Sequence, residues 1–148
     1  MTLKIPKLLR PLIYTNRWLH PGHDKLKEAV PFIRDPIEFP GPNYSMDFSS
    51  LSLSGQEEPE SHMFFEYRST KTCDNRDLPW IDIDLSIFVV VNKIPGDDVG
   101  LVMDYRTNHD DPRVVGNDWH SKHNGCIWRE VAPSFTSFCE LLGILPNQ

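Results

Sequence analysis

Two histidines and a cysteine, spaced three residues apart, are the nearest approach of this sequence to a metal site. His120, His123 and Cys126 carry the nitrogen and sulfur ligands that zinc accepts. A structural zinc site normally needs four ligands, usually with a close pair such as CxxC. The chain is also expected to turn at Asn124-Gly125, so the three side chains need not converge. We therefore expect surface histidines, no bound metal and no cofactor.

Pairs of aspartates recur in the second half of the chain. They are Asp82 and Asp84, Asp97 and Asp98, and Asp110 and Asp111. Acid–base catalysis needs one carboxyl group with a raised pKa in a cleft. Aspartates in turns flanked by glycine or proline more simply bond their own backbone. A calcium loop at residues 82–84 would need further ligands and a glycine that are missing. Two roles stay open for the pairs at 97–98 and 110–111, turn formation and anchoring of a partner's lysines and arginines.

Nucleophilic chemistry lacks a supporting motif. There is no GxSxG, GxGxxG or GKS/GKT element in the chain. Cys139 falls on the apolar face of an expected helix, where a thiol is buried and inert. Cys73 falls in a polar loop with no histidine close in sequence. We expect a protein that is not an enzyme.

The elements that would position these residues are clearest in the last third of the chain. Apolar, branched residues at 99–105 predict a strand, and the polar cluster at 106–111 predicts a turn ending at Pro112. Further strands are expected at 113–119 and 126–131. Ser134 is a suitable N-cap and Gly143 a suitable C-cap for a helix between them. The apolar residues of that helix recur at helical spacing and are Phe135, Phe138, Leu141 and Leu142.

Upstream elements are less regular, because 13 prolines favour short elements and many turns. Residues 3–18 are expected to form an extended arm with a short strand at 12–15, and residues 36–42 a Pro/Gly-rich connection. A helix is expected at 23–34, kinked or ended by Pro31. Weak strands are expected at 48–53 and 62–68. Residues 84–91 form the most apolar run and predict a central strand covered on both faces.

Charged and aromatic residues close the predicted strands. Asp104 and Tyr105 end one strand, and Asp118 ends the next. Neighbouring strands would bring Asp104 or Asp118 close to an arginine, and such a pair would lock the strand ends. The arginines within reach are Arg106, Arg113 and Arg129. A partner-facing role for this group is the alternative, since tyrosine, tryptophan and arginine dominate interface hot spots. We expect Trp128 to pack in the core and Trp119 to lie at the surface as a candidate partner contact.

Composition and charge narrow the classes of function. The apolar fraction of 39% in 148 residues supports one folded domain. No apolar run approaches the ~20 residues that span a bilayer, and prolines interrupt any signal peptide, so we expect a cytoplasmic protein without membrane contact. Residues 57–118 contain fourteen acidic and six basic residues, a net charge of −8. This acidic middle disfavours direct binding to nucleic acid and favours a basic protein partner.

The last third also resembles a known family. The motif residues are Asp97-Asp98, Asp104-Tyr105-Arg106, Pro112-Arg113-Val114-Val115 and Trp128 to Phe135 with Phe138. They resemble the C-terminal half of the SUKH superfamily, the Smi/Knr-type domains related to a cell-wall (glucan synthesis) regulator. The resemblance is good over roughly the last third of the chain and looser over residues 80–95. Further upstream it rests mainly on a helix-like segment, and the family's Gly-Gly signature is not evident there.

The resemblance implies a single α+β domain over residues 1–148, with a mostly antiparallel sheet flanked by helices from each end of the chain. It also implies a non-catalytic binding protein. Many bacterial members are immunity proteins that neutralise a toxin, often a nuclease. We expect that function, with a basic toxin domain as partner. The alternative is a regulatory scaffold of the cell-wall-regulator type that binds endogenous proteins or a small ligand.

Overall fold

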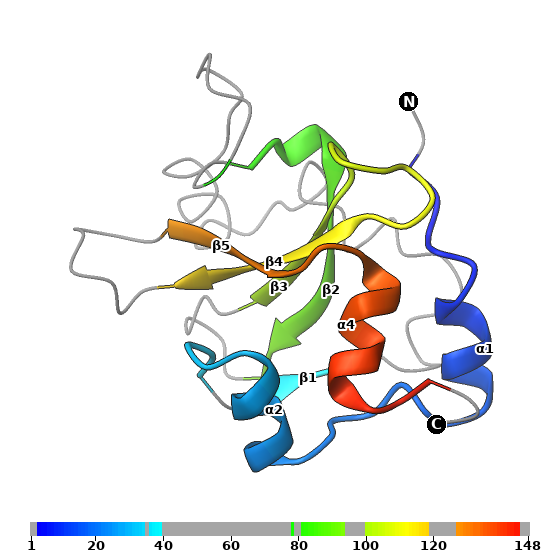
Figure 1. Cartoon of the computed structure of the whole chain (residues 1–148), viewed down its shortest axis with the longest axis vertical. Helices are drawn as coiled ribbons and strands as arrows, with labels where there is room; N and C mark the ends of the chain where they lie inside the picture. Colours follow the sequence, from blue (N-terminus) through cyan, green and yellow to red (C-terminus); the bar gives the residue numbers. More distant parts are fainter. Residues whose placement is uncertain are drawn as a thin grey trace.

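An antiparallel sheet of five strands forms the centre of the protein. The computed structural model describes residues 3–34, 36–39, 78, 81–93, 100–118 and 127–145. The strands are β1 (Ile37–Glu38), β2 (Ser86–Asn92), β3 (Gly100–Asp104), β4 (Arg113–Asp118) and β5 (Ile127–Ala132). Their order in the sheet is β1-β2-β3-β4-β5, and each strand is antiparallel to the next (Figure 1).

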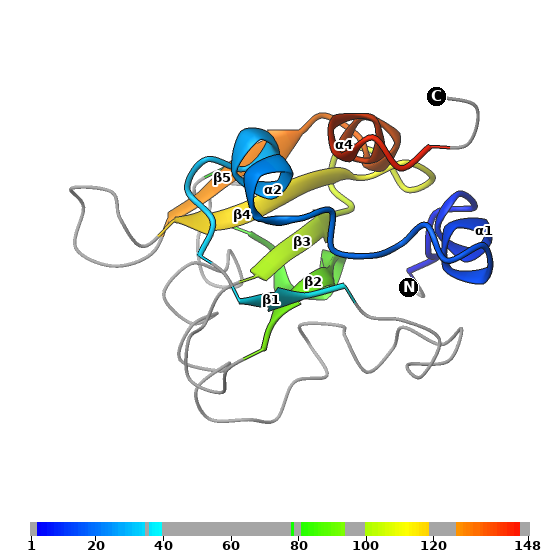
Figure 2. The ribbon, with the colours of Figure 1, turned by 90° about the horizontal axis from the view of Figure 1, so that it is seen from below.

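Helices from both ends of the chain flank this sheet. They are α1 (Leu9–Tyr14), α2 (His23–Ala29) and α4 (Phe135–Leu142), with a short 3-10 turn at Ile83–Leu85 before β2. Figure 2 shows α2 and α4 side by side on one face of the sheet and α1 beyond its end. None of the described helices is long and apolar enough to cross a membrane. The arrangement is the single-domain α+β fold predicted from the sequence.

The predicted C-terminal helix is confirmed with both of its caps. Ser134 Oγ accepts a hydrogen bond from the backbone N–H of Ser137 at 3.0 Å, and Gly143 follows the helix with a left-handed φ of 69°. Glycine tolerates that conformation at little cost. The buried stripe of α4 has helical spacing and consists of Phe135, Phe138, Cys139 and Leu142. Leu141 lies outside it and is 43% exposed, so its assignment to the apolar face was wrong.

The N-terminal segment corrects a second prediction. Residues 12–15 do not form a strand, because residues 9–14 form α1, with Leu9, Leu12 and Ile13 buried. Pro11 is the third residue of this helix. The first N–H groups of a helix have no intrahelical partner, so a proline there removes no hydrogen bond. A proline that looked like a helix breaker is therefore compatible with the helix start.

Two further elements differ from their predicted bounds. Helix α2 ends at Ala29, with Val30 as its C-cap, since Pro31 cannot continue the hydrogen-bond ladder. Residues 37–38, expected within a Pro/Gly-rich connection, form the edge strand β1 against β2. Among the described residues, the middle strand of the sheet is β3, and β2 has a neighbour on its other side only at Val91 and Asn92, where the short β1 pairs with it. Strand β2 starts at Ser86 rather than Asp84. The strands expected at 48–53 and 62–68 lie outside the described residues.

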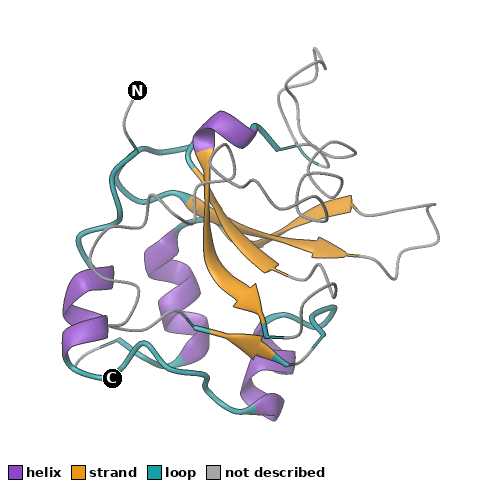
Figure 3. Ribbon diagram, turned by 180° about the vertical axis from the view of Figure 1, so that it is seen from behind, coloured by secondary structure: helices purple, strands orange, loops and turns teal. Residues whose placement is uncertain are grey.

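Both faces of the sheet carry buried apolar side chains, because successive residues of a strand point to opposite faces. On the helix-bearing face, Leu101 and Met103 of β3 join a core that includes Phe135 and Phe138. Val102, between them, belongs to a second cluster on the other face of the sheet. Figure 3 shows the ribbon of the sheet from behind, on the side away from α2 and α4. The buried members of that cluster are Ile81, Val102, Val115 and Trp128. The predicted core position of Trp128 is confirmed.

A close approach on the helix-bearing face explains a glycine in β4. A Cβ atom placed on Gly116 would lie 2.8 Å from Leu101 Cδ2 and 2.9 Å from the ring of Phe32. Any larger residue would push this ring away from the sheet. Glycine at this position therefore lets the segment after α2 pack directly on β4.

The first prediction concerns the aromatic contact between α4 and the N-terminal segment. Phe138 is fully buried and lies 6.3 Å, ring centroid to centroid, from Trp18. We expect Phe138→Ala to lower the free energy of unfolding by about 3–5 kcal/mol, because a cavity remains in the core. Leu141→Ala, on the exposed side of the same helix, is the control and should change it by less than about 0.5 kcal/mol. Equal urea midpoints for the two variants would contradict this role of Phe138.

Candidate functional site

The turn between β3 and β4 starts from a buried aspartate held by two arginines. Asp104 is fully buried at the end of β3. Arg106 donates to it from Nε at 2.9 Å and from Nη2 at 2.8 Å, a two-point contact. Arg113, directly opposite on β4, donates from Nε at 2.9 Å, and its Nη2 lies 2.8 Å from Asp104 Oδ2 in an ion pair. One carboxylate thus joins the last residue of β3, the turn and the first residue of β4.

The environment of Asp104 determines its charge. Burial alone would raise the pKa of this carboxyl group, because it removes the charged form from water. The hydrogen bonds and positive charge of Arg106, together with the charge of Arg113, outweigh burial and hold the pKa below its usual range. Asp104 is therefore ionised in the folded protein at neutral pH.

A second ion pair closes the other end of β4. Arg129 Nε on β5 lies 2.6 Å from Asp118 Oδ2 on β4. The prediction that Asp104 and Asp118 pair with nearby arginines is thus confirmed. Arg113 also reaches Glu130 at 3.8 Å, but that carboxylate is half exposed and the contact is long. Of these ion pairs, those of Asp104 with Arg106 and Arg113 are the ones in which both side chains are largely buried.

Tyr105 connects this region to the N-terminus of the chain. Its ring is fully buried, and its hydroxyl group donates a hydrogen bond of 2.8 Å to the backbone oxygen of Lys4. Burial raises the pKa of the phenol, so the group remains a neutral donor. Residues 4–8, called the N-terminal arm below, are in this way attached to the end of β3.

The turn itself is held by an asparagine that the sequence analysis did not single out. Asn108 Oδ1 accepts hydrogen bonds from the backbone N–H groups of Asp110 at 2.8 Å and Asp111 at 3.0 Å. The two aspartates therefore receive backbone support from Asn108 and do not form the turn with their own carboxylates. Asp82 does act as predicted, because its Oδ1 accepts from the backbone N–H of Asp84 at 3.0 Å.

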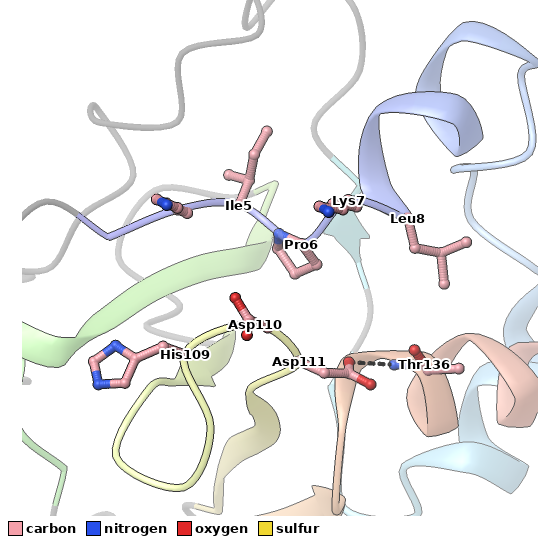
Figure 4. Close-up of a pocket in the computed structure, with 9 residues that line it drawn as sticks. Ile5, Pro6, Lys7, Leu8, His109, Asp110, Asp111 and Thr136 are labelled. Atoms are coloured by element: carbon pink, nitrogen blue, oxygen red, sulfur yellow. Dashed lines mark hydrogen bonds between the residues drawn. The ribbon is translucent and has the colours of Figure 1, made fainter.

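The two aspartates of the turn have different roles. Asp111 is half buried, and its Oδ1 accepts a hydrogen bond of 3.0 Å from the backbone N–H of Thr136 in the first turn of α4 (Figure 4). Asp110 is exposed, and its carboxylate makes no hydrogen bond or ion pair in the described part of the chain. Of the predicted partner contacts at 110–111, Asp110 is thus presented to solvent while Asp111 supports a helix.

A groove of about 540 Å³ lies between the turn and the N-terminal arm. Figure 4 shows the arm on one side and His109 and Asp110 on the other, with Asp111 and Thr136 at one end. No sequence pattern indicates this groove, because its two walls are about 100 residues apart in the chain. The lining residues are Lys4, Ile5, Pro6, Lys7, Leu8, His109, Asp110, Asp111 and Thr136.

Other residues considered for chemistry are placed as follows. Cys139 is buried on α4, and burial raises the pKa of its thiol to about 12, with smaller contributions from the charges of Asp111 and Glu140. Among the described residues, no three His, Cys, Asp or Glu side chains gather as a metal site. Seven residues that the sequence offers as nucleophile, metal ligand or partner contact lie outside the described part of the chain. They are Cys73, Asp97, Asp98, Trp119, His120, His123 and Cys126.

Comparison of the chain with protein-family models, with curated proteins and with solved structures finds no significant match.

The second prediction concerns Asp104. The folded-state pKa is depressed, so its contribution to stability is complete above the unfolded value of about 3.9 and is lost as pH falls through the folded value. We expect Asp104→Asn to cost about 3–5 kcal/mol at pH 7, since it leaves two arginines facing a neutral group. Urea unfolding should show this difference shrinking below about pH 4. Glu130→Gln, at the long exposed contact, should cost less than about 1 kcal/mol. A difference between Asp104→Asn and wild type that is independent of pH would contradict the assignment.

The third prediction separates the two aspartates of the turn. Asp111→Ala should destabilise the protein by about 1 kcal/mol, because Thr136 N–H loses the side-chain acceptor that caps α4. Asp110→Ala removes an exposed carboxylate and should change stability by less than about 0.5 kcal/mol. Thermal unfolding of the two variants measures the difference. A larger loss for Asp110→Ala would reverse the roles assigned here.

Proposed function

We propose that this chain is a non-catalytic binding protein and acts as a cytoplasmic bacterial immunity protein of the Smi/Knr (SUKH) type. Its partner would be a basic, nuclease-type toxin domain. The proposal combines the motif resemblance of the last third of the chain with the chemistry of the β3–β4 turn. The turn offers an exposed carboxylate for binding, and its buried groups serve its structure.

The observation that carries the proposal is the rigid support of Asp110. The residues that carry the resemblance in β3 and β4 are the ones that hold the turn, through the bonds of Arg106 and Arg113 to Asp104. Asn108 then orients the backbone of the turn. Asp110 extends from this support without a described partner. Because the backbone that carries this carboxylate is already held in the free protein, only side-chain freedom is lost when it binds a lysine or arginine.

Charge supports the same choice of partner. The net charge of −8 over residues 57–118 creates a negative potential that attracts a basic surface and raises the rate of encounter. Nuclease domains bind phosphates through basic residues, so an acidic protein complements their surface. Asp97, Asp98 and Trp119 complete the proposed contact set, outside the described residues.

The alternative, a regulatory scaffold of the cell-wall-regulator type, uses the same fold but does not require a basic partner. A scaffold of this type would not protect cells against a toxin. Reversing the charge of Asp110 would slow the formation of its complexes no more than reversing another exposed acidic residue.

The fourth prediction tests acidic docking with a basic nuclease toxin domain, and the first to test is any toxin domain that a gene next to the one for this chain is found to encode. Asp110→Lys should slow association about three- to tenfold at low salt, because a charge near the contact acts mainly on the association rate. The difference should nearly vanish at 1 M salt, where the Debye length is about 3 Å. Stopped-flow mixing at both salt concentrations measures these rates.

Glu28→Lys is the matched control, because it makes the same charge change on an exposed residue of α2. It should slow association less than Asp110→Lys. Cells that express the toxin should survive with the wild-type protein and the control and should grow poorly with Asp110→Lys. Full protection by Asp110→Lys with an unchanged rate would contradict acidic docking, and no protection by the wild-type protein would contradict the immunity function.

A further inference from the structure

The groove between the N-terminal arm and the β3–β4 turn has opposite charges on its two walls. Lys4 and Lys7 extend from the arm, and Asp110 extends from the turn. All three residues are exposed. Neither ammonium group forms an ion pair in the described part of the chain, and the Asp110 carboxylate makes none. The charges therefore face one groove without neutralising each other.

Both walls are held in place before any ligand arrives. On the arm, the Tyr105 hydroxyl group bonds Lys4 O at 2.8 Å, and Leu9 N–H bonds Pro6 O at 3.0 Å. On the turn, Asn108 holds the backbone of Asp110, and Asp111 is attached to Thr136 of α4. A groove with fixed walls binds its ligand without the cost of ordering loops.

The space between the walls suits a small molecule with an apolar part. Its volume of about 540 Å³ lies within the usual range for small-ligand sites, roughly 300–1,000 Å³. Ile5, Pro6 and Leu8 supply apolar surface on the arm. In Figure 4 the Asp110 carboxylate points from the turn toward Pro6, so a charged acceptor adjoins this apolar surface.

We propose that this groove binds a zwitterion of the amino-acid or short-peptide type. Its ammonium group pairs with Asp110, its carboxylate pairs with Lys4 or Lys7, and its apolar side chain lies against Ile5, Pro6 and Leu8. An anion alone would leave Asp110 unpaired, and a cation alone would leave both lysines unpaired. This site does not require a toxin, so it goes beyond the proposed immunity function and is tested without one.

The experiment is a titration of the ¹⁵N-labelled full chain with leucyl-leucine, followed by amide chemical shifts. We expect saturable shifts at Ile5, Lys7, Asp110 and Thr136, with a Kd of roughly 1 mM or tighter. N-acetylated leucyl-leucine lacks the ammonium group, and the C-terminal amide lacks the carboxylate. Each should bind about tenfold more weakly, because each loses a charge-assisted contact. Free leucine distinguishes the source: binding equal to the dipeptide indicates an amino-acid site, and weaker binding indicates a peptide site.

Variants assign each charge to its wall of the groove. Asp110→Asn should lower the affinity for the free dipeptide about tenfold. It should not lower the affinity for the acetylated dipeptide further, because that ligand already lacks the ammonium group that pairs with Asp110. The double variant Lys4→Met with Lys7→Met should bind the free dipeptide more weakly. Its affinity for the C-terminal amide of leucyl-leucine should be unchanged, because that ligand lacks the carboxylate. Glu28→Gln is the control and should bind like the wild type. The proposal would be overturned if leucyl-leucine gives no saturable shifts up to about 10 mM. It would also be overturned if the loss of affinity from the modified ligand and the loss from the substituted protein add to each other.

Discussion

The buried carboxylate of Asp104 is the interaction on which the arrangement of the β3–β4 region depends. A fully buried charge is costly unless opposite charges and hydrogen bonds surround it. Arg106 and Arg113 meet this requirement from the turn and from the facing strand, and they keep the carboxyl group ionised. Since any displacement of these residues leaves a charge unpaired, β3, the turn and β4 are held in one geometry.

The neighbouring groups extend this constraint to both ends of the chain. Tyr105, next to Asp104, bonds the N-terminal arm, and Asp111 in the turn bonds the first turn of α4. The turn therefore joins three segments that are far apart in the sequence. This arrangement also leaves Asp110 exposed beside the groove, where it is available to a partner or to a ligand. The two proposals above concern the same carboxylate but call for different contacts around it.

Much of the fold was predictable because its signals are local. The caps Ser134 and Gly143 and the spacing of Phe135 and Phe138 predicted α4, and apolar, branched runs closed by polar turns predicted β3, β4 and β5. Two failures have equally clear causes. Pro11 suggested an interruption, although a proline in the first turn of a helix removes no hydrogen bond. Strand β1 has two residues and exists only because β2 lies beside it.

The sequence by itself determined the acidic middle, and it predicted the strands and helix of the last third, arginine partners for the strand-end aspartates, and the acidic turn at 110–111. These features follow from residue type and short spacing. Only the tertiary structure decided that Asp111 caps α4, that Asn108 holds the turn, and that the N-terminal arm forms a groove with it. The reason is that each hydrogen bond depends on where the folded chain places particular backbone N–H groups, those of Thr136, Asp110 and Asp111. Two of these three features also join segments whose distance in the chain gives no local pattern to read.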